Sequence, residues 1–157
     1  MIEFTSDETT LFEGKAFFHG RVFLGTHFET FGSIQQVFGI NEYRFQWRHA
    51  VNRCVHDGNT SCLIASLSIN NEGACSVQYF GLYPGEIVAG QKSSIANIVV
   101  TEGFMSWNTE IVTIDKDKCL VRKKIFEKLI DLYSLMRTDI DDISKFTVAN
   151  SIATSIL

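Results

Sequence analysis

The sequence has only one proline, Pro84, and no low-complexity run of serine, glycine or charged residues. Linkers between domains are usually rich in such residues. Because one hydrophobic core commonly serves about 100–200 residues, their absence predicts a single domain over residues 1–157. Apolar residues make up 45% of the chain, with thirteen phenylalanines among them, and they are sufficient to fill such a core.

Long hydrophobic runs are missing as well. No stretch approaches the roughly 18 consecutive apolar residues that a membrane-spanning helix needs. The beginning of the chain carries acids where a secretory signal peptide would carry basic residues. We therefore expect a cytoplasmic protein that does not enter the membrane.

Cysteines are few and are not arranged in pairs. No C-x-x-C motif occurs, and the four histidines supply no second pair of ligands at metal-binding spacing. The apolar content also removes the need for disulfide cross-links. We expect free thiols, no bound metal and no cofactor. The cysteines are Cys54, Cys62, Cys75 and Cys119.

Basic charge is never concentrated in one segment. The net charge is −4, and residues 1–14 contain four acids without a lysine or arginine. A second acidic segment lies near the C-terminus, and between the two only a small positive excess remains. Binding to nucleic acid requires a concentrated basic field, so the sequence argues against it. An acidic protein favours a basic partner.

The first half of the chain shows two clear secondary-structure patterns. Aromatic and β-branched residues over 15–24 and 27–31 predict a hairpin or a bulged pair of strands. A 3.6-residue period then predicts a helix, with Asn41 as the N-cap and Gly58 at its end. The apolar stripe of this helix comprises Tyr43, Trp47, Ala50, Val51, Cys54 and Val55.

Beyond Gly58 the pattern changes to short strands separated by turns. Strands are predicted over 62–69, 74–83 and 86–91, with turns at 70–73 and 84–85. Further strands are expected over 95–100 and 109–114. Short connections of this kind favour an antiparallel meander.

The C-terminal part returns to a helical period. One helix is predicted from Cys119 to Met136, and a second follows Thr138 or Asp139, although β-branched residues weaken the second. The second helix would bury Ile140, Ile143, Phe146 and Ile152. The predicted fold is α+β, in which an antiparallel β-meander sheet has one helix after the N-terminal strands and C-terminal helices packed on the sheet.

Catalytic groups are not evident. Cys54 with His56, and Ser66 with His49, can be nominated only because they are close in sequence. Cys54 falls on the apolar stripe of the predicted helix, where a buried and inert thiol is the usual finding. No nucleophile elbow, phosphate loop or dinucleotide fingerprint occurs. We expect no catalytic residues, and hence a protein that is not an enzyme.

Aromatic residues on the predicted strands could form a platform for single-stranded bases. Such a platform also needs lysine and arginine on the same strands to neutralise phosphates, and these are not interleaved here. Core packing is the expected role of these aromatics. They are Phe17, Phe23, Phe28, Phe31, Tyr79 and Phe80.

The stretch from Tyr43 to about Val100 resembles a known group of proteins, and the motifs that carry the resemblance lie within residues 43–88. The shared features are Tyr43-x-x-x-Trp47-x-x-Ala50 on a helix, the segment from Gly58 to Leu67, and the strand ending in Leu82-Tyr83 before a short turn. These features resemble the immunity proteins of contact-dependent growth inhibition systems, called CdiI proteins. The chain departs from that pattern at residues 87–91, at Phe80 where tryptophan is common, and in its last segment, 139–157.

The resemblance implies a curved, Whirly-like antiparallel sheet with flanking helices, and a protein that neutralises a cognate toxin. The implied partner is the C-terminal domain of that toxin, a basic nuclease whose active site would be covered. Acids at turns and strand ends are the expected contacts, because an acidic surface complements a phosphate-binding cleft. The candidates are Glu29, Glu42, Asp57, Glu72 and Glu86.

Two other functions stay open on the sequence alone. One is an acidic protein-binding module such as a secretion chaperone, which would expose a continuous apolar groove. The other is a small-ligand carrier or enzyme, which would need a pocket with convergent polar groups. That pocket would be lined by Phe17, Phe23, Tyr79 and Trp107.

Overall fold

The computed structural model describes residues 2–24, 27–70, 72–84, 97–108 and 145–149. Within these residues it has seven strands and one helix, which confirms the α+β class. The predictions at 86–91, 109–114 and 119–136 lie outside the described residues. The elements are β1 (Ile2–Phe12), β2 (Lys15–Leu24), β3 (His27–Ile34), α1 (Ile40–Val55), β4 (Ser61–Ile69), β5 (Ala74–Pro84), β6 (Asn97–Asn108) and β7 (Lys145–Ala149).

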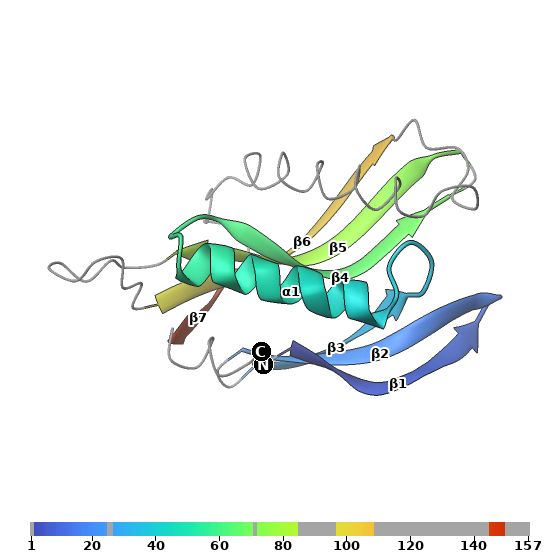
Figure 1. Ribbon diagram of the computed structural model, residues 1–157, viewed down its shortest axis with the longest axis horizontal. Helices are drawn as coiled ribbons and strands as arrows, with labels where there is room; N and C mark the ends of the chain where they lie inside the picture. Colours follow the sequence, from blue (N-terminus) through green and yellow to red (C-terminus); the bar gives the residue numbers. More distant parts are fainter. Residues whose placement is uncertain (1, 25–26, 71, 85–96, 109–144, 150–157) are drawn as a thin grey trace, which may run out of the picture.

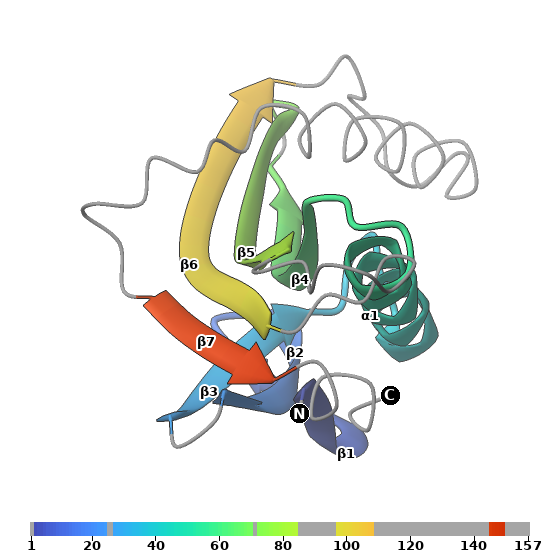
Figure 2. The ribbon, with the colours of Figure 1, turned by 90° about the vertical axis from the view of Figure 1, so that its left-hand side faces the viewer.

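The strands form two antiparallel sheets, with the orders β1-β2-β3 and β4-β5-β6-β7 (Figure 1). Each sheet is a meander. The meander after Gly58 was predicted, whereas the first sheet was expected only as a pair of strands, and the division into two sheets was not predicted. Figure 2 shows the second sheet as a strongly curved layer, with α1 packed beside β4 and the first sheet below. The description as Whirly-like, which came from the resemblance, stays a prediction.

Strand β1 corrects the sequence analysis, which treated residues 1–14 only as an acidic segment. The strand was missed because its apolar residues are few, and only Ile2 and Phe4 are buried. Its pairing with β2 also shifts register between Phe4 and Thr9, which breaks the two-residue alternation. An edge strand exposed to water can therefore be polar along most of its length.

The N-cap of helix α1 lies two residues before the expected position. Asn41 was predicted as the N-cap, but the N-cap is Gly39, and Asn41 lies in the first turn. The backbone N–H of Gly39 donates to Oε2 of Glu42 at 3.0 Å, which is half of a capping box. The predicted end is confirmed, because the C-cap is His56 and Gly58 follows with φ of 66°.

Strand β6 is longer than the strand predicted over 95–100. It continues from Asn97 to Asn108 and pairs with the whole of β5. Gly103 obscured this continuity because glycine is disfavoured in strands. In the fold, the ring of cross-strand Tyr79 covers Gly103, so that a β-carbon there would lie 2.3 Å from Cζ of Tyr79.

Residues 145–149 overturn part of the second C-terminal helix. They form strand β7, in which Phe146 and Val148 pair with Val100 and Ile98 of β6. The predicted helical spacing included Phe146, but β-branched Thr147 and Val148 prefer an extended backbone. Pairing with the edge of β6 decided the outcome.

The core lies where α1 meets both sheets. Trp47 is buried and its ring centroid lies 4.7 Å from that of Phe4 on β1 and 6.0 Å from that of Phe31 on β3. Phe31 in turn contacts Phe80 of β5, with 6.2 Å between the centroids. This aromatic cluster joins the two sheets through the helix, as the expected core role of Phe31 and Phe80 requires.

Strand β4 is an edge strand, yet side chains close its free edge. Residues of α1 and of the segment before it supply the hydrogen bonds that a neighbouring strand would supply. We call this contact the α1–β4 seam. Its bonds are Gln46 Nε2 to Cys62 O (2.6 Å), Ile64 N to Gln46 Oε1 (2.9 Å), Trp47 Nε1 to Ile64 O (2.7 Å), Leu67 N to Tyr43 Oη (3.1 Å), Gln36 Nε2 to Ile69 O (2.8 Å) and Ile69 N to Gln36 Oε1 (2.8 Å).

Candidate functional site

The five predicted contact acids do not share one edge. Glu29 lies half-buried on β3, Glu42 in the first turn of α1, and Asp57 just beyond the end of α1. At 1.5 Å per residue, the helix separates Glu42 from Asp57 by about 22 Å. Glu72 is exposed in the turn between β4 and β5, and Glu86 lies outside the described residues. Their role in binding stays a prediction.

Glu42 and Glu72 lie at the same end of the molecule, because β4 runs antiparallel to α1. The seam places Gln36, before the helix, against the last residue of β4, and Gln46 against Cys62 near its first. Side-chain Oδ1 of Asn70 accepts hydrogen bonds from the backbone N–H groups of Glu72 and Ala74, at 3.0 and 2.8 Å. The turn that presents Glu72 is therefore well defined.

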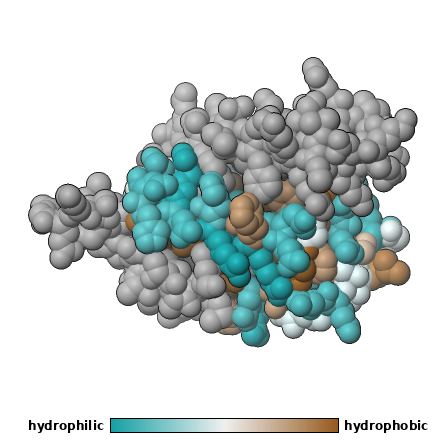
Figure 3. All heavy atoms as spheres, viewed as in Figure 1, coloured by the Kyte–Doolittle hydropathy of each residue, from teal (hydrophilic) through white to brown (hydrophobic). Residues whose placement is uncertain are grey.

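The hairpin of β1 and β2 extends to this same end. Phe12 pairs with Lys15, and the two residues between them, Glu13 and Gly14, have φ of 49° and 73°. Positive φ at both positions suits the two-residue turn that follows the twist of a hairpin. Leu11 and Phe12 lie outside the core, and they are 80% and 65% exposed. Figure 3 shows hydrophobic spheres at the right-hand end, where Figure 1 places the tip of this hairpin.

A hollow of about 560 Å³ lies between this tip and the end of β4. We call it the tip hollow. The hairpin forms one wall, the last residues of β4 form the other, and the segment that joins β3 to α1 lies between them. Its lining residues are Leu11, Gly14, Lys15, Ala16, Ile34, Gln35, Gln36, Ser68, Ile69 and Asn70.

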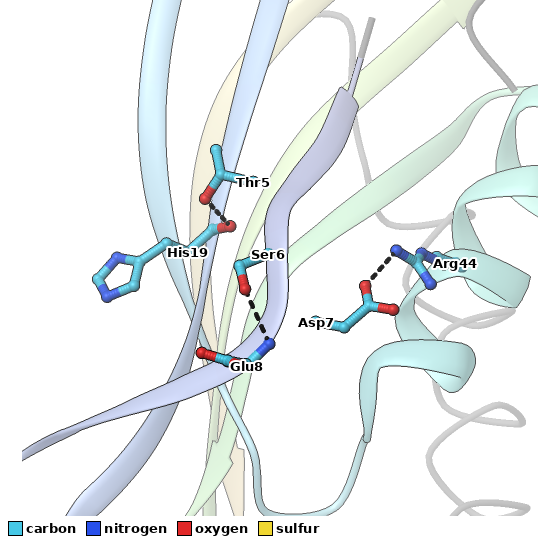
Figure 4. A network of polar contacts seen from close by, with 6 residues as sticks. All are labelled: Thr5, Ser6, Asp7, Glu8, His19 and Arg44. Carbon is cyan, nitrogen blue, oxygen red and sulfur yellow. Dashed lines mark hydrogen bonds and ion pairs between the residues drawn. The ribbon is translucent and has the colours of Figure 1, made fainter.

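The middle of β1 is irregular and is held by polar contacts (Figure 4). Thr5 Oγ1 donates to the carbonyl of His19 at 3.0 Å, and the backbone N–H of Glu8 donates to Ser6 Oγ at 3.0 Å. Arg44 of α1 reaches Asp7 with 2.8 Å between the charged atoms. The Asp7–Arg44 ion pair connects the projecting hairpin to the helix.

Charge on the hairpin is mainly negative. Asp7 is 72% exposed even with its partner Arg44, and Glu8 and Glu13 are exposed and form no ion pair with any residue that the structure describes. Lys15 is the one charged residue among those lining the hollow. Sequence analysis recognised these acids as a group, but it did not select them as contacts because residues 1–14 were not assigned a structure.

The nominated catalytic pairs are not assembled. Burial raises the pKa of the Cys54 thiol to about 12, so it stays protonated, whereas His56 is exposed to solvent. Ser66 Oγ accepts a hydrogen bond from the backbone N–H of Ile34 at 3.4 Å and serves to join β3 to β4, while His49 is exposed on α1.

The other described cysteines are buried, as Cys54 is. Cys62 and Cys75 are also free and buried, and burial raises the pKa of each to about 12. Cys119 lies outside the described residues. Within the described part of the chain, no three metal-ligating side chains gather at one place.

Helix α1 is not long and apolar enough to cross a membrane, and no other described element is a helix.

The aromatic residues that would line a ligand carrier's pocket come from both sheets. Phe17 and Phe23 lie on β2 of the first sheet, whereas Tyr79 lies on β5 of the second and packs over Gly103. None of them lines the tip hollow. The side chain of Trp107 is outside the part that the structure describes.

Neither the models of known families nor the curated proteins give a match to this sequence. Among solved structures, a chain of the "CdiA-CT/CdiI toxin and immunity complex from Enterobacter cloacae" has a similar fold, with a TM-score of 0.66. The match covers 99% of this chain and 93% of that chain at 13% sequence identity. It establishes a shared architecture over nearly the whole length, and it agrees with the resemblance seen in residues 43–88.

Proposed function

We propose that this protein is an immunity protein that binds a cognate toxin domain and neutralises it by covering its active site. The single observation that carries the proposal is the whole-chain likeness to a chain of a toxin and immunity complex. Fold alone does not define function, so the surface must agree with it. We further propose that the protein acts in the cytoplasm and has no catalytic role of its own.

The surface supports a basic partner. The exposed acids Glu8 and Glu13 have no ion-pair partner among the described residues, and the chain as a whole is negative. A nuclease presents a basic cleft to its phosphate substrate, and an acidic protein that approaches this cleft gains electrostatic steering. A toxin of the nuclease class is therefore the proposed partner.

The likeness is to a complex that contains both a toxin and an immunity protein, so the two roles must be distinguished. A toxin that cleaves nucleic acid needs a basic cleft and activated catalytic groups. Here β1 carries three acids and no cation, and the described cysteines are buried thiols with raised pKa values. These features support the role of the immunity protein.

The test uses the cognate toxin domain, obtained by capture with the tagged protein from its native lysate. Producing that domain in a bacterial host should stop growth, and co-producing this protein should restore it. The purified pair should elute as one complex, and added protein should abolish the toxin's cleavage of nucleic acid. An unrelated toxin domain serves as the control for specificity. Growth arrest that persists despite stable, folded protein would overturn the proposal.

A further inference from the structure

The tip hollow combines exposed large apolar side chains with a concave surface. Protein surfaces seldom leave both features in contact with water at one place. Leu11 and Phe12 are consecutive large apolar residues, and both are mostly exposed. Leu11 also lines a hollow whose apolar lining includes Ala16, Ile34 and Ile69. Burying such side chains against a partner removes apolar surface from water and therefore favours binding. Clustered apolar exposure of this kind marks interaction sites.

The site is also held in shape before any partner arrives. Gln36 both donates to and accepts from the backbone of Ile69, and the backbone N–H of Gln35 donates to the carbonyl of Ala16 at 2.8 Å. These bonds fix the base of the hollow relative to both walls. A preformed site loses less conformational entropy on binding than one that must be ordered.

Charge at the rim indicates the chemistry of the occupant. Glu13 lies in the hairpin turn next to the lining residue Gly14, and Glu72 lies in the turn after β4, two residues from the lining residue Asn70. Both acids are exposed. Glu8 adds a third exposed acid along β1. Lys15 offsets one of these charges, so the described part of the rim stays acidic.

We propose that the tip hollow is where the toxin domain docks. The occupant is a basic segment of that domain, which packs an apolar side chain against Leu11 and Phe12 and places lysine or arginine against Glu13 and Glu72. This proposal rests on the proposed function and adds the surface that performs it. It retains Glu72 from the acids predicted by sequence and removes Asp57, which lies at the other end of α1.

The first experiment measures binding of the purified toxin domain by calorimetry. The double variant Leu11→Ser/Phe12→Ser should weaken the affinity at least about tenfold, as is typical for truncated residues at the centre of an interface. Phe104→Ser is the matched control, because Phe104 is 68% exposed on β6 and does not line the hollow. Its affinity should change less than about twofold.

The second experiment tests the rim with charge reversal. Glu13→Lys and Glu72→Lys should each weaken binding several-fold at low salt, with a smaller effect at high salt because ions screen exposed charges. Asp57→Lys makes the same change of charge at the far end of α1 and should leave the affinity unchanged. Circular dichroism and thermal unfolding would show that each variant is folded.

Hydrogen exchange of the complex provides a readout that does not depend on substitution. Binding should slow exchange in residues 9–17, 34–36 and 68–73 more than in the exposed part of α1. If the toxin domain binds the hollow variants and the controls equally, the docking surface is wrong and the immunity function stands. If wild-type protein does not bind the toxin domain at all, both proposals fail.

Discussion

In the described part of the chain, the outer edges of β4 and β1 both lack a neighbouring strand, but only the edge of β4 is closed by side chains. Each belongs to the outermost strand of its sheet in the described order, and an open strand edge invites pairing with another chain. The edge of β4 is closed by Gln36, Tyr43, Gln46 and Trp47 within the seam. The edge of β1 is instead irregular, charged and exposed.

This difference separates stability from recognition. At the seam, buried polar groups are satisfied by neighbours, and an unsatisfied buried group would cost about 1–3 kcal/mol. On the hairpin, Leu11 and Phe12 face water and contribute little to folding. Substitutions should therefore affect the free energy of unfolding at one edge and partner binding at the other.

The largest loss of stability is expected for Trp47→Ala. It removes the ring at the centre of the aromatic cluster and leaves the carbonyl of Ile64 without its donor. The free energy of unfolding should fall by about 3–5 kcal/mol. Urea denaturation measures it, with exposed Arg48→Ala as the neighbouring control. A loss below about 1 kcal/mol would remove the seam from the stabilising core.

Gln46→Ala should have the next largest effect. The substitution removes the buried side-chain amide that donates to the carbonyl of Cys62 and accepts from the N–H of Ile64, and both backbone groups lose their partner. We expect a loss of about 2–4 kcal/mol in the free energy of unfolding. Gln35→Ala, in the segment before α1, should change it by less than about 0.5 kcal/mol. Equal effects of the two would mean that the seam adds nothing to stability.

Gly20→Ala tests the part of the hairpin where β2 packs against the core. A β-carbon there would lie 2.3 Å from Cζ of Phe31, a buried ring that has little room to move. The expected cost is about 1–3 kcal/mol. At Gly32 the nearest atom would be Cδ1 of Phe17 at 3.4 Å, so Gly32→Ala should be nearly neutral. Thermal unfolding of the two variants distinguishes the positions.

The smallest effect on stability is expected at the hairpin tip. Leu11→Ser/Phe12→Ser should change the free energy of unfolding by less than about 0.5 kcal/mol, because both side chains are exposed. The same variant should lose toxin binding. Denaturation and calorimetry on one preparation make the contrast with Trp47→Ala direct. Marked unfolding of the tip variant would show that the hairpin belongs to the core after all.

Sequence patterns predicted the elements that bury one regular face. The period of α1, the β2–β3 hairpin and the strands β4 and β5 were all expected, because repeated burial imposes a repeated apolar spacing. Strand β1 and the extension of β6 were missed where that spacing is broken, by a bulge at Phe4 to Thr9 and by Gly103. Strand β7 was misassigned because local spacing competed with pairing to β6.

The candidate site was less accessible to sequence analysis than the fold. The acidic balance indicated a basic partner, but Glu42 proved to close the helix cap and Asp57 proved to lie far from Glu72 along α1. Leu11 and Phe12 precede a Glu-Gly pair, which is a turn signal. No pattern in the sequence indicated that the hairpin would extend past the core.

The sequence by itself determined the class of fold, the aromatic-rich packing of the described core and the negative net charge, since these follow from composition and periodicity. Tertiary structure decided which edge was closed and which stayed open. Seam side chains separated by up to 33 residues from the backbone groups they bind come together only on folding. The tip hollow likewise depends on three segments that only the packing of the two sheets brings together.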